Sequence, residues 1–430
     1  MAPAQLVASD VTRLGLVCSE PIRERMAGIG IRYLEIARRL PALGVDAVLL
    51  SPGDPAEAVA LGIDAARVRP LERGRLAASL ADCDAALGQG QWANDLVLEA
   101  GRLPVAIDLY DPWLIENLHY TATLGLDPYK NDHASWVLQM SRGDFFLCSS
   151  DEQRQFYLGF LACLGRVNPE RLAADPDLRE LVDVVPFGVP ERLPEHRPYL
   201  APRRARQVRL LFGGLYDWYD PWTLLRALER LDEPEVELLL IRNPNAGATP
   251  QRLFAEVEAW AKSHGWWGSR LQALDWVPSD RRYDLLRDVD LLVAPHHPSL
   301  ETRLSLRTRF LDAFAAGCPV VTTEGGAVSA LVRDAEAGWV VPAGDDAALA
   351  DALRSALQGE PERRRRSDAG RRLADRFTWE RALAPLVRFA RAPRRDASKE
   401  AFAHRIATQA PEDPALFRLR RWLKRRTGAA

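Results

Sequence analysis

Two carboxylates and a phenol stand together in the segment Asp108-Leu-Tyr110-Asp111-Pro-Trp, directly after an apolar run that predicts a strand. Side chains of this kind at a strand end can orient the hydroxyl groups of a ligand or accept a proton from one. Glu116 and Asn117 follow about one helical turn later and can join the cluster. An Asp/Pro turn that caps the next helix explains the same residues without a ligand. We favour the functional interpretation because two acids and a phenol occur together.

A basic segment, SLETRLSLRTRFLDAFAAG at 299–317, offers the complementary chemistry. Arg303, Arg307 and Arg309 stand near the start of a predicted helix. A helix N-terminus and a guanidinium both direct N–H groups at an anion, so the segment is suited to a pyrophosphate. Asp312 follows, and a carboxylate can accept hydrogen bonds from both hydroxyls of a ribose. The segment therefore predicts a nucleotide site; the alternative is a solvated basic helix face.

The loop Ala27-Gly28-Ile29-Gly30 precedes another predicted helix. Its small residues allow backbone N–H groups to approach a ligand closely. The spacing is not a full GxGxxG, so a dinucleotide site is weakly supported and a tight turn without a ligand stays open.

Metal chemistry has little support in this sequence. His296 and His297 are adjacent in a predicted extended segment, where neighbouring side chains point to opposite faces. The DxD patterns at 82–84 and 288–290 are interpreted as structural. We therefore expect a site that requires no metal ion.

These residues lie in loops of a chain in which short apolar runs alternate with amphipathic ones, which predicts parallel sheets with helices on both faces. Strands are predicted at 14–18, 45–50, 85–87, 105–109, 145–148, 208–212, 236–241, 291–294 and 320–323. Helices are predicted at 28–40, 221–231, 253–264, 281–288, 306–316 and 347–357. Ligands of doubly wound sheets bind beyond the carboxyl ends of the strands, where the candidate residues stand.

A chain of 430 residues exceeds what one hydrophobic core usually supports. The stretch VVPFGVP at 184–190 and the Pro/Arg-rich residues after it interrupt the alternation, which then restarts. We predict an N-terminal domain over 1–190, a linker over 191–206 and a C-terminal domain over 207–392, whose last helix can cross back to the first domain. A basic tail follows over 393–430.

Composition and charge narrow the classes of protein. The net charge of −2 excludes a global attraction to nucleic acid. The five cysteines are widely spaced and are expected to be free thiols in a reducing compartment. The sequence shows no signal-peptide pattern and no bilayer-spanning apolar stretch, so we expect a cytoplasmic protein.

The tail is the exception to this balance of charge. Leu416, Leu419 and Leu423 fall on one helical face, and six basic residues lie between 418 and 426. This pattern, within residues 415–427, predicts a helix on an anionic membrane surface. A solvated tail, or a helix that packs on this chain or on a partner protein, is the alternative.

Together these segments resemble the GT-B glycosyltransferases, in particular the mostly retaining group-1-type enzymes of bacterial surface polysaccharide synthesis. The resemblance runs over about residues 13–390 and is most specific at 314–357, which contains AAGCPVVTTEGGAVSALVRDAEAGWVVPAGDDAALADAL. Arg32 stands at the group's helix arginine, VVPFGVP resembles its interdomain linker, and Asp275-Trp276-Val277-Pro278 resembles its loop beside the nucleotide base.

The resemblance implies two Rossmann-like domains facing across a cleft and the transfer of a hexose-type sugar from a nucleotide-diphosphate sugar to a glycan or lipid-linked acceptor. The C-terminal domain would bind the donor and the N-terminal domain the acceptor. The expected catalytic residues are Asp108, Asp111 and Arg307, and the expected acceptor-binding residues are Tyr110, Glu116 and Asn117. The expected donor-binding residues are Gly28, Gly30, Gly214, Arg242, Trp276, Val277, Arg303, Ser305, Thr308 and Asp312. No cofactor beyond the nucleotide sugar is expected.

Three departures from the group's pattern matter. Asp312 stands at the second glutamate of its donor motif, but Ser305 stands at the first, and Glu301 lies four residues earlier. The group's Arg and Lys after the glycine turn are absent from the segment GGLYDWYD at 213–220, which makes Arg307 the best candidate for phosphate neutralisation. DLYDP replaces a common histidine. A nucleotide-sugar epimerase and a non-catalytic binding subunit therefore stay open, as does the stereochemical outcome.

Overall fold

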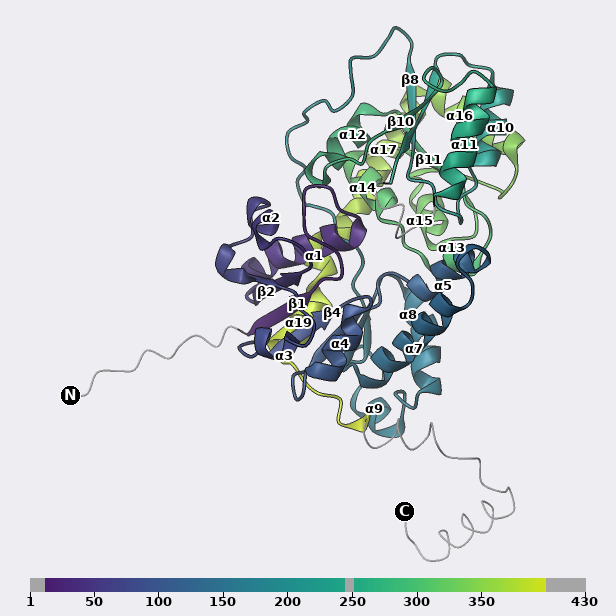
Figure 1. The fold of residues 1–430 in the computed structure, drawn as a ribbon. Coiled ribbons are helices and arrows are strands. Elements are labelled where there is room, and N and C mark those ends of the chain that lie inside the picture. Colours follow the sequence, from purple (N-terminus) through teal and green to yellow (C-terminus); the bar gives the residue numbers. More distant parts are fainter. Residues whose placement is uncertain (1–11, 244–250, 400–430) are drawn as a thin grey trace, which may run out of the picture.

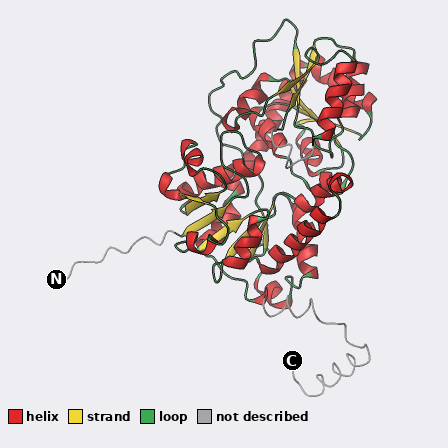
Figure 2. Ribbon diagram, viewed as in Figure 1, coloured by secondary structure: helices red, strands yellow, loops and turns green. Residues whose placement is uncertain are grey.

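The computed structural model describes residues 12–243 and 251–399, which form two α/β domains (Figure 1). In each domain helices cover both faces of a parallel sheet (Figure 2). The predicted fold class is therefore confirmed. The described chain has no helix that combines the length and the apolar character needed to cross a bilayer.

The N-terminal sheet has seven strands in the order β3-β2-β1-β4-β5-β6-β7, and all its pairings are parallel. Its inner strands are continuous apolar runs because helices bury both of their faces. The strands are β1 Arg13–Val17, β2 Asp46–Ser51, β3 Val68–Pro70, β4 Ala85–Gly88, β5 Val105–Asp108, β6 Phe145–Cys148 and β7 Val182–Val184. The helices of this half are α1 Gly28–Arg39, α2 Pro55–Ala60, α3 Leu76–Ser79, α4 Trp92–Glu99, α5 Trp113–Asn117, α6 Thr121–Leu124, α7 Asp127–Arg142, α8 Asp151–Cys163 and α9 Pro169–Ala174.

The C-terminal sheet has six parallel strands in the order β10-β9-β8-β11-β12-β13. They are β8 Val208–Gly213, β9 Val236–Ile241, β10 Leu271–Leu274, β11 Leu291–Ala294, β12 Val320–Thr323 and β13 Gly338–Val341. The helices are α10 Pro221–Leu231, α11 Arg252–Ser263, α12 Arg282–Asp288, α13 Leu300–Leu304, α14 Thr308–Ala316, α15 Ala327–Ala335, α16 Asp346–Gln358 and α17 Glu360–Ala374.

One difference from the sequence prediction affects the site. The helix predicted from residue 306 begins at Thr308, and Arg307 is its N-cap residue in an extended conformation. Arg303 lies before it on the separate short helix α13 and is exposed. The sequence predicts that the three arginines stand near the start of one helix. In the structure they do not share one helix start.

The end of the chain returns to the N-terminal domain through α18, Trp379–Ala382, and α19, Ala384–Arg391. The Phe389 ring stacks on Phe145 of β6 at 5.2 Å between centroids, and Arg388 forms an ion pair with Asp183 of β7 at 2.6 Å. Beyond the predicted boundary at residue 392, Asp396 is buried and pairs with Arg166 at 2.7 Å. The described part of the basic tail thus packs on the first domain.

Gly188, in the VVPFGVP stretch before the linker, packs against α18, so a substitution there tests how closely the two are packed. A Cβ at Gly188 would lie 2.2 Å from the ring of Trp379, which is fully buried. We expect Gly188→Ala to lower the free energy of unfolding by about 1–3 kcal/mol through overpacking, measured as a lower melting temperature. Gly159→Ala on α8 is the matched control, because nothing lies within 4 Å of its Cβ. An equal effect of both substitutions would contradict this account of the linker.

Candidate functional site

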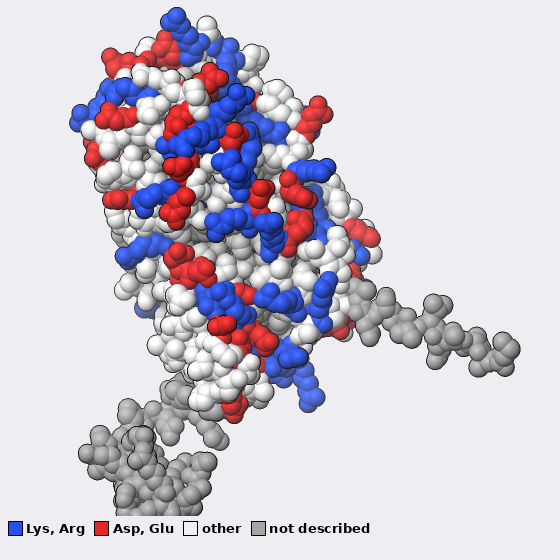
Figure 3. All heavy atoms as spheres, turned by 180° about the vertical axis from the view of Figure 1, so that it is seen from behind, with Lys and Arg blue, Asp and Glu red and all other residues white. Residues whose placement is uncertain are grey.

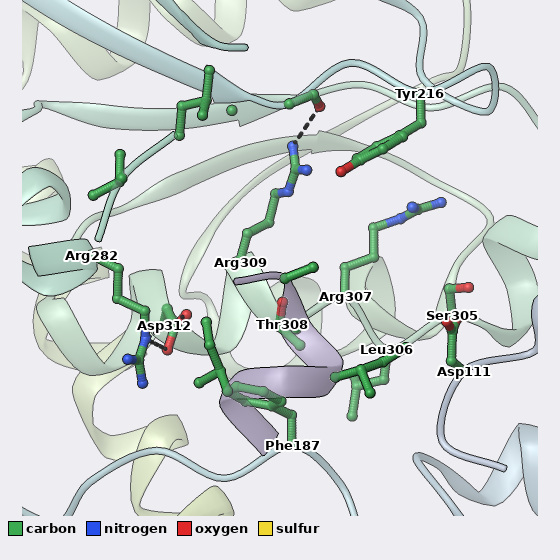
Figure 4. A pocket seen from close by; sticks show the side chains of 18 of the residues that line it. Asp111, Phe187, Tyr216, Arg282, Ser305, Leu306, Arg307, Thr308, Arg309 and Asp312 are labelled. Atoms are coloured by element: carbon green, nitrogen blue, oxygen red, sulfur yellow. Dashed lines mark hydrogen bonds and ion pairs between the residues drawn. The ribbon is translucent and has the colours of Figure 1, made fainter. Parts of the chain in front are cut away.

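A cavity of about 340 Å³ lies between the two domains, at the carboxyl ends of their strands. It is lined from the N-terminal domain by the loops after β1 and β5 and from the C-terminal domain by loops after β8, β9, β10 and β11 (Figure 4). Predicted site residues on its wall are Gly28, Tyr110, Asp111, Glu116, Gly214, Trp276, Val277, Ser305, Arg307, Thr308 and Asp312. Residues from separate parts of the chain therefore meet at one cavity.

The N-terminus of α14 opens onto this cavity. No side chain caps its first turn. Its nine residues end at Ala316, and the next residue, Gly317, has a φ of 71° and forms the left-handed C-cap. Thr308 and Arg309, at the start of the helix, both line the cavity. The uncapped N–H groups and the positive end of the helix dipole favour an anion at this point.

Two guanidinium groups stand beside that helix start, and Figure 4 shows them extending side by side toward Tyr216. The Nη2 of Arg307 lies 2.5 Å from Oε2 of Glu301, and its guanidinium lies 4.8 Å from the ring centroid of Tyr219. Among the described residues, Glu301 is the one carboxylate that forms an ion pair with either arginine. Arg309 thus has no carboxylate partner among the described residues.

Arg309 holds the glycine turn after β8. Its Nη1 donates hydrogen bonds to the carbonyl oxygens of Phe212 at 2.8 Å and Gly214 at 3.2 Å. A Cβ at Gly213, whose φ is 90°, would lie 2.8 Å from that nitrogen, so this residue must stay small. From the sequence, Arg309 is a weaker candidate than Arg307 for phosphate neutralisation. Nothing in the sequence shows that Arg309 reaches the turn about ninety-six residues away.

The opposite end of the cavity carries Asp312 and the loop after β10. Asp312 forms an ion pair with Arg282 at 3.3 Å, and Arg282 also donates to the hydroxyl of Tyr283 at 3.0 Å. Trp276 donates its indole N–H to the carbonyl of Met26 at 3.1 Å, which joins the two domains at this edge. Arg282, which sequence reasoning missed, thus fixes the orientation of the Asp312 carboxylate.

Asp111 and Glu116 face the cavity from the N-terminal domain. Burial raises the pKa of both carboxyls, and the charge of Asp111 further raises the pKa of Glu116. The two carboxyls are close enough for each to shift the pKa of the other. Arg307 is a nearby positive charge that lowers both pKa values. This pair can bind or deprotonate a hydroxyl group.

Asp108 does not reach the cavity wall, which contradicts its predicted catalytic contact. Its carboxylate forms an ion pair at 2.7 Å with Arg32, and both side chains are fully buried. Arg32 also donates to the carbonyls of Val185 and Pro186 at 2.9 Å, and its guanidinium lies 4.8 Å from the Tyr110 ring centroid. Asp108 therefore fixes Arg32, and Arg32 in turn contacts the backbone at Val185 and Pro186 and the ring of Tyr110.

Gly30 is a second correction. Its amide donates to the Glu20 carboxylate at 2.7 Å, and the amide of Ala27 donates to the same carboxylate at 2.6 Å. Glu20 therefore occupies the anion site at the start of α1 that the sequence analysis assigned to the donor. Gly28 does line the cavity, and its absent side chain leaves room opposite Thr308.

Three other predicted residues point elsewhere. Arg242 pairs with Glu258 at 3.2 Å and lies over the ring of Phe254. Asn117 donates to Asp132 at 2.7 Å, and Arg303 is exposed on α13. None of the three lines the cavity.

Within the described ranges, no group of three His, Cys, Asp or Glu side chains is arranged to hold a metal ion. His296 is buried and burial keeps its pKa well below the usual value, so it is neutral there. On the face shown in Figure 3, acidic and basic side chains are interspersed, in agreement with the near-neutral total charge.

Comparison with known proteins finds similarity to glycosyltransferases, which lies in the second domain for the family model. Residues 206–359 match the family model described as glycosyl transferases group 1. A phosphatidyl-myo-inositol mannosyltransferase of Mycobacterium leprae is 30% identical over 212 residues, 47% of this chain and 52% of that protein. A D-inositol 3-phosphate glycosyltransferase of Xylanimonas cellulosilytica is 34% identical over 186 residues, 43% of this chain and 40% of that protein. The chain spans about half the length of these curated relatives, or less.

Solved structures match over most of the chain. Anabaena HepE, solved in complex with UDP and glucose, superposes with a TM-score of 0.65 and 15% identity, covering 88% of this chain and 98% of HepE. A sucrose-phosphate synthase from Thermosynechococcus elongatus gives a TM-score of 0.64 at 15% identity with the same coverage. At this identity the likeness establishes the GT-B fold.

Proposed function

We propose that this chain, whose fold is GT-B and whose residues 206–359 form a group 1 glycosyltransferase domain, transfers a sugar from a nucleotide-diphosphate sugar to an acceptor hydroxyl. One observation carries the proposal. Arg307 and Arg309 lie together at the uncapped start of α14, inside the cavity between the domains, with a single carboxylate paired to either of them. A diphosphate supplies the negative charge that this arrangement favours.

The nucleotide would extend from this point toward the loop after β10. Asp312 can accept hydrogen bonds from the ribose hydroxyls, and Trp276 and Val277 line the cavity where the base would lie. The sugar would then face Asp111 and Glu116 on the other domain. This places the donor on the C-terminal domain and the acceptor hydroxyl at the acidic pair.

The chemistry follows from where charge develops. As the bond between the sugar and the diphosphate breaks, negative charge grows on the leaving phosphate, next to Arg307 and the start of α14. Fixed donors at that position stabilise the transition state more than the bound substrate, because they need no reorganisation as charge appears. The acidic pair orients the acceptor hydroxyl for attack, and these arginines provide the positive charge without a metal ion.

We also propose which class of sugar and which class of acceptor the chain uses. The proposed sugar is a hexose, and the proposed acceptor is a glycan or a lipid-linked molecule in cell-surface polysaccharide synthesis. The relative named phosphatidyl-myo-inositol mannosyltransferase supports a hexose and a lipid-linked acceptor. Product analysis with and without acceptor separates transfer from epimerisation, which needs no acceptor. A chain that binds nucleotide sugar but turns none over would be a binding subunit.

Nucleotide binding is the first test. We expect a nucleoside diphosphate or its sugar, screened over UDP, GDP, ADP and dTDP compounds, to raise the melting temperature. At a hundredfold excess over the dissociation constant, the ligand should add about 2.7 kcal/mol to the free energy of unfolding. Asp312→Asn should reduce that shift, because an amide accepts fewer hydrogen bonds from the ribose and pairs poorly with Arg282. The absence of a shift with every compound would contradict the proposed donor site.

We also propose that the basic tail holds the protein at an anionic membrane surface, such as the inner leaflet. The residues concerned, 415–427, lie outside the described part of the chain. Each Lys or Arg near such a surface contributes about 1 kcal/mol of attraction. In flotation assays, the full chain should bind phosphatidylglycerol vesicles but not phosphatidylcholine vesicles, and salt should release it. A version ending at Lys399, which keeps the buried Asp396, should not bind, and equal binding of both versions would exclude the tail as the anchor.

A further inference from the structure

We infer that Glu301 is a positioning residue for the transfer reaction, acting through Arg307. The inference rests on the proposed function and concerns a residue that the family pattern does not place. In the sequence, Glu301 lies four residues before the position of the group's missing motif glutamate, which is Ser305 here. In the structure, it is the carboxylate that holds the cavity arginine.

The contact is short and buried. Oε2 of Glu301 accepts from Nη2 of Arg307 at 2.5 Å, and the exposed fractions of the two side chains are 0% and 8%. The rings of Tyr219 and Trp218 lie 4.8 and 5.7 Å from the same guanidinium. Arg307 is therefore fixed by a carboxylate on one side and by aromatic rings on others, so its charge has one position at the cavity.

The short helix that carries Glu301 is itself held firmly. Ser299 caps α13 by accepting from the amide of Thr302 at 3.0 Å, and the hydroxyl of Thr302 donates to the carbonyl of His297 at 2.9 Å. The backbone of Glu301 thus has a fixed place between the end of β11 and the start of α14. The carboxylate that contacts Arg307 therefore comes from α13 and not from α14.

The arrangement is costly as a purely structural feature. The second oxygen of Glu301, Oε1, is buried without a hydrogen-bond partner among the described residues. A buried ion pair often gives no more stability than apolar side chains of the same volume, and an unsatisfied carboxylate oxygen adds a further cost. Holding a guanidinium where charge develops on a leaving phosphate accounts for the pair.

The experiment is a double-mutant cycle with Glu301→Ala, Arg307→Ala and the double variant, measured by kcat for sugar transfer and by the affinity for UDP. We expect Glu301→Ala to lower kcat about 10–100-fold, the range of a lost charge-assisted bond, while the KM for the donor changes less than about threefold. If Glu301 acts through Arg307, the double variant should match Arg307→Ala within about twofold. Glu301→Gln keeps an acceptor oxygen and should recover part of the loss.

The matched control is Glu237→Gln, which weakens another buried ion pair of the same domain, with Arg209 at 3.4 Å. This control should lower the melting temperature and leave kcat unchanged. Additive losses in the cycle, or a Glu301→Ala variant that resembles the control, would overturn the inference. Failure of the parent chain to bind any nucleotide would instead refute the proposed function.

Discussion

Arg307→Ala is expected to reduce kcat/KM for sugar transfer about 100–1000-fold while the fold survives. Arg307 directs a guanidinium at the cavity from the start of α14, beside the position proposed for the leaving diphosphate. Removing one preorganised donor to a developing oxyanion costs rate by about this factor. Arg307→Lys should recover little, because an ammonium group lacks the planar fork that pairs with Glu301 and stacks on Tyr219.

Arg303→Ala is the control for that result. Arg303 lies in the same basic segment but is exposed on α13 and does not line the cavity. It should turn over like the parent chain, with at most a small change in the salt dependence of donor binding. If Arg307→Ala keeps parent-like kcat/KM, or if Arg303→Ala loses as much, the donor phosphates bind elsewhere.

The strands that the sequence predicted are those in the middle of the two sheets. The four that it missed, β3, β7, β10 and β13, are the outer strands of the sheets. Inner strands are buried on both faces and appear as continuous apolar runs, as in VELLLI of β9. An outer strand such as VRP of β3 is only partly buried, so it lacks that signal.

Where a local pattern was sufficient, the residues predicted from the sequence do line the cavity. The segment from Ser305 to Asp312 was recognised because its charges and its helix start lie within a few residues. The choice between Asp108 and Asp111 was not local. Only the folded chain shows that Arg32, far away in sequence, takes Asp108 into a buried ion pair and leaves Asp111 at the cavity.

Long-range replacement explains the other differences. Glu20 takes the amides of Ala27 and Gly30, which a glycine loop would otherwise offer to a ligand. Arg309 reaches the glycine turn after β8, so a guanidinium stands there although the segment after that turn has no Arg or Lys. In both cases the chemical group is present but comes from another element, which residue spacing alone does not show.

Glu116→Gln is expected to lower kcat for transfer about 100-fold and to leave nucleotide affinity unchanged. Glu116 lines the cavity from α5, on the domain opposite Arg307, and its pKa is raised by burial and by the charge of Asp111. A positioned carboxylate that binds or deprotonates a reacting hydroxyl contributes rate of this order. The matched control is Asp127→Asn, whose carboxylate is 94% exposed and pairs with Lys130. This variant should behave like the parent.

The pH dependence follows from the direction of the pKa shifts. Burial raises the pKa of both Asp111 and Glu116, so the pair gains its second proton above the ordinary carboxyl range of about 4. We expect kcat to fall as pH decreases through that raised pKa, because the pair then carries two protons and can no longer accept one from a hydroxyl group. For stability the sign is opposite, because a raised pKa means that folding favours the protonated form.

The contribution of Glu116 to stability should therefore be present at low pH and be lost as pH rises through its folded pKa. Glu116→Gln, which cannot ionise, should then gain melting temperature relative to the parent chain at pH 8 and not at pH 4. The kcat and the melting temperature of both chains should be measured over this pH range. The kcat should fall at low pH, and the stability contribution of Glu116 should be lost at high pH. A Glu116→Gln variant that keeps the kcat of the parent chain, or that loses nucleotide affinity, would show that the acidic pair is not the acceptor site.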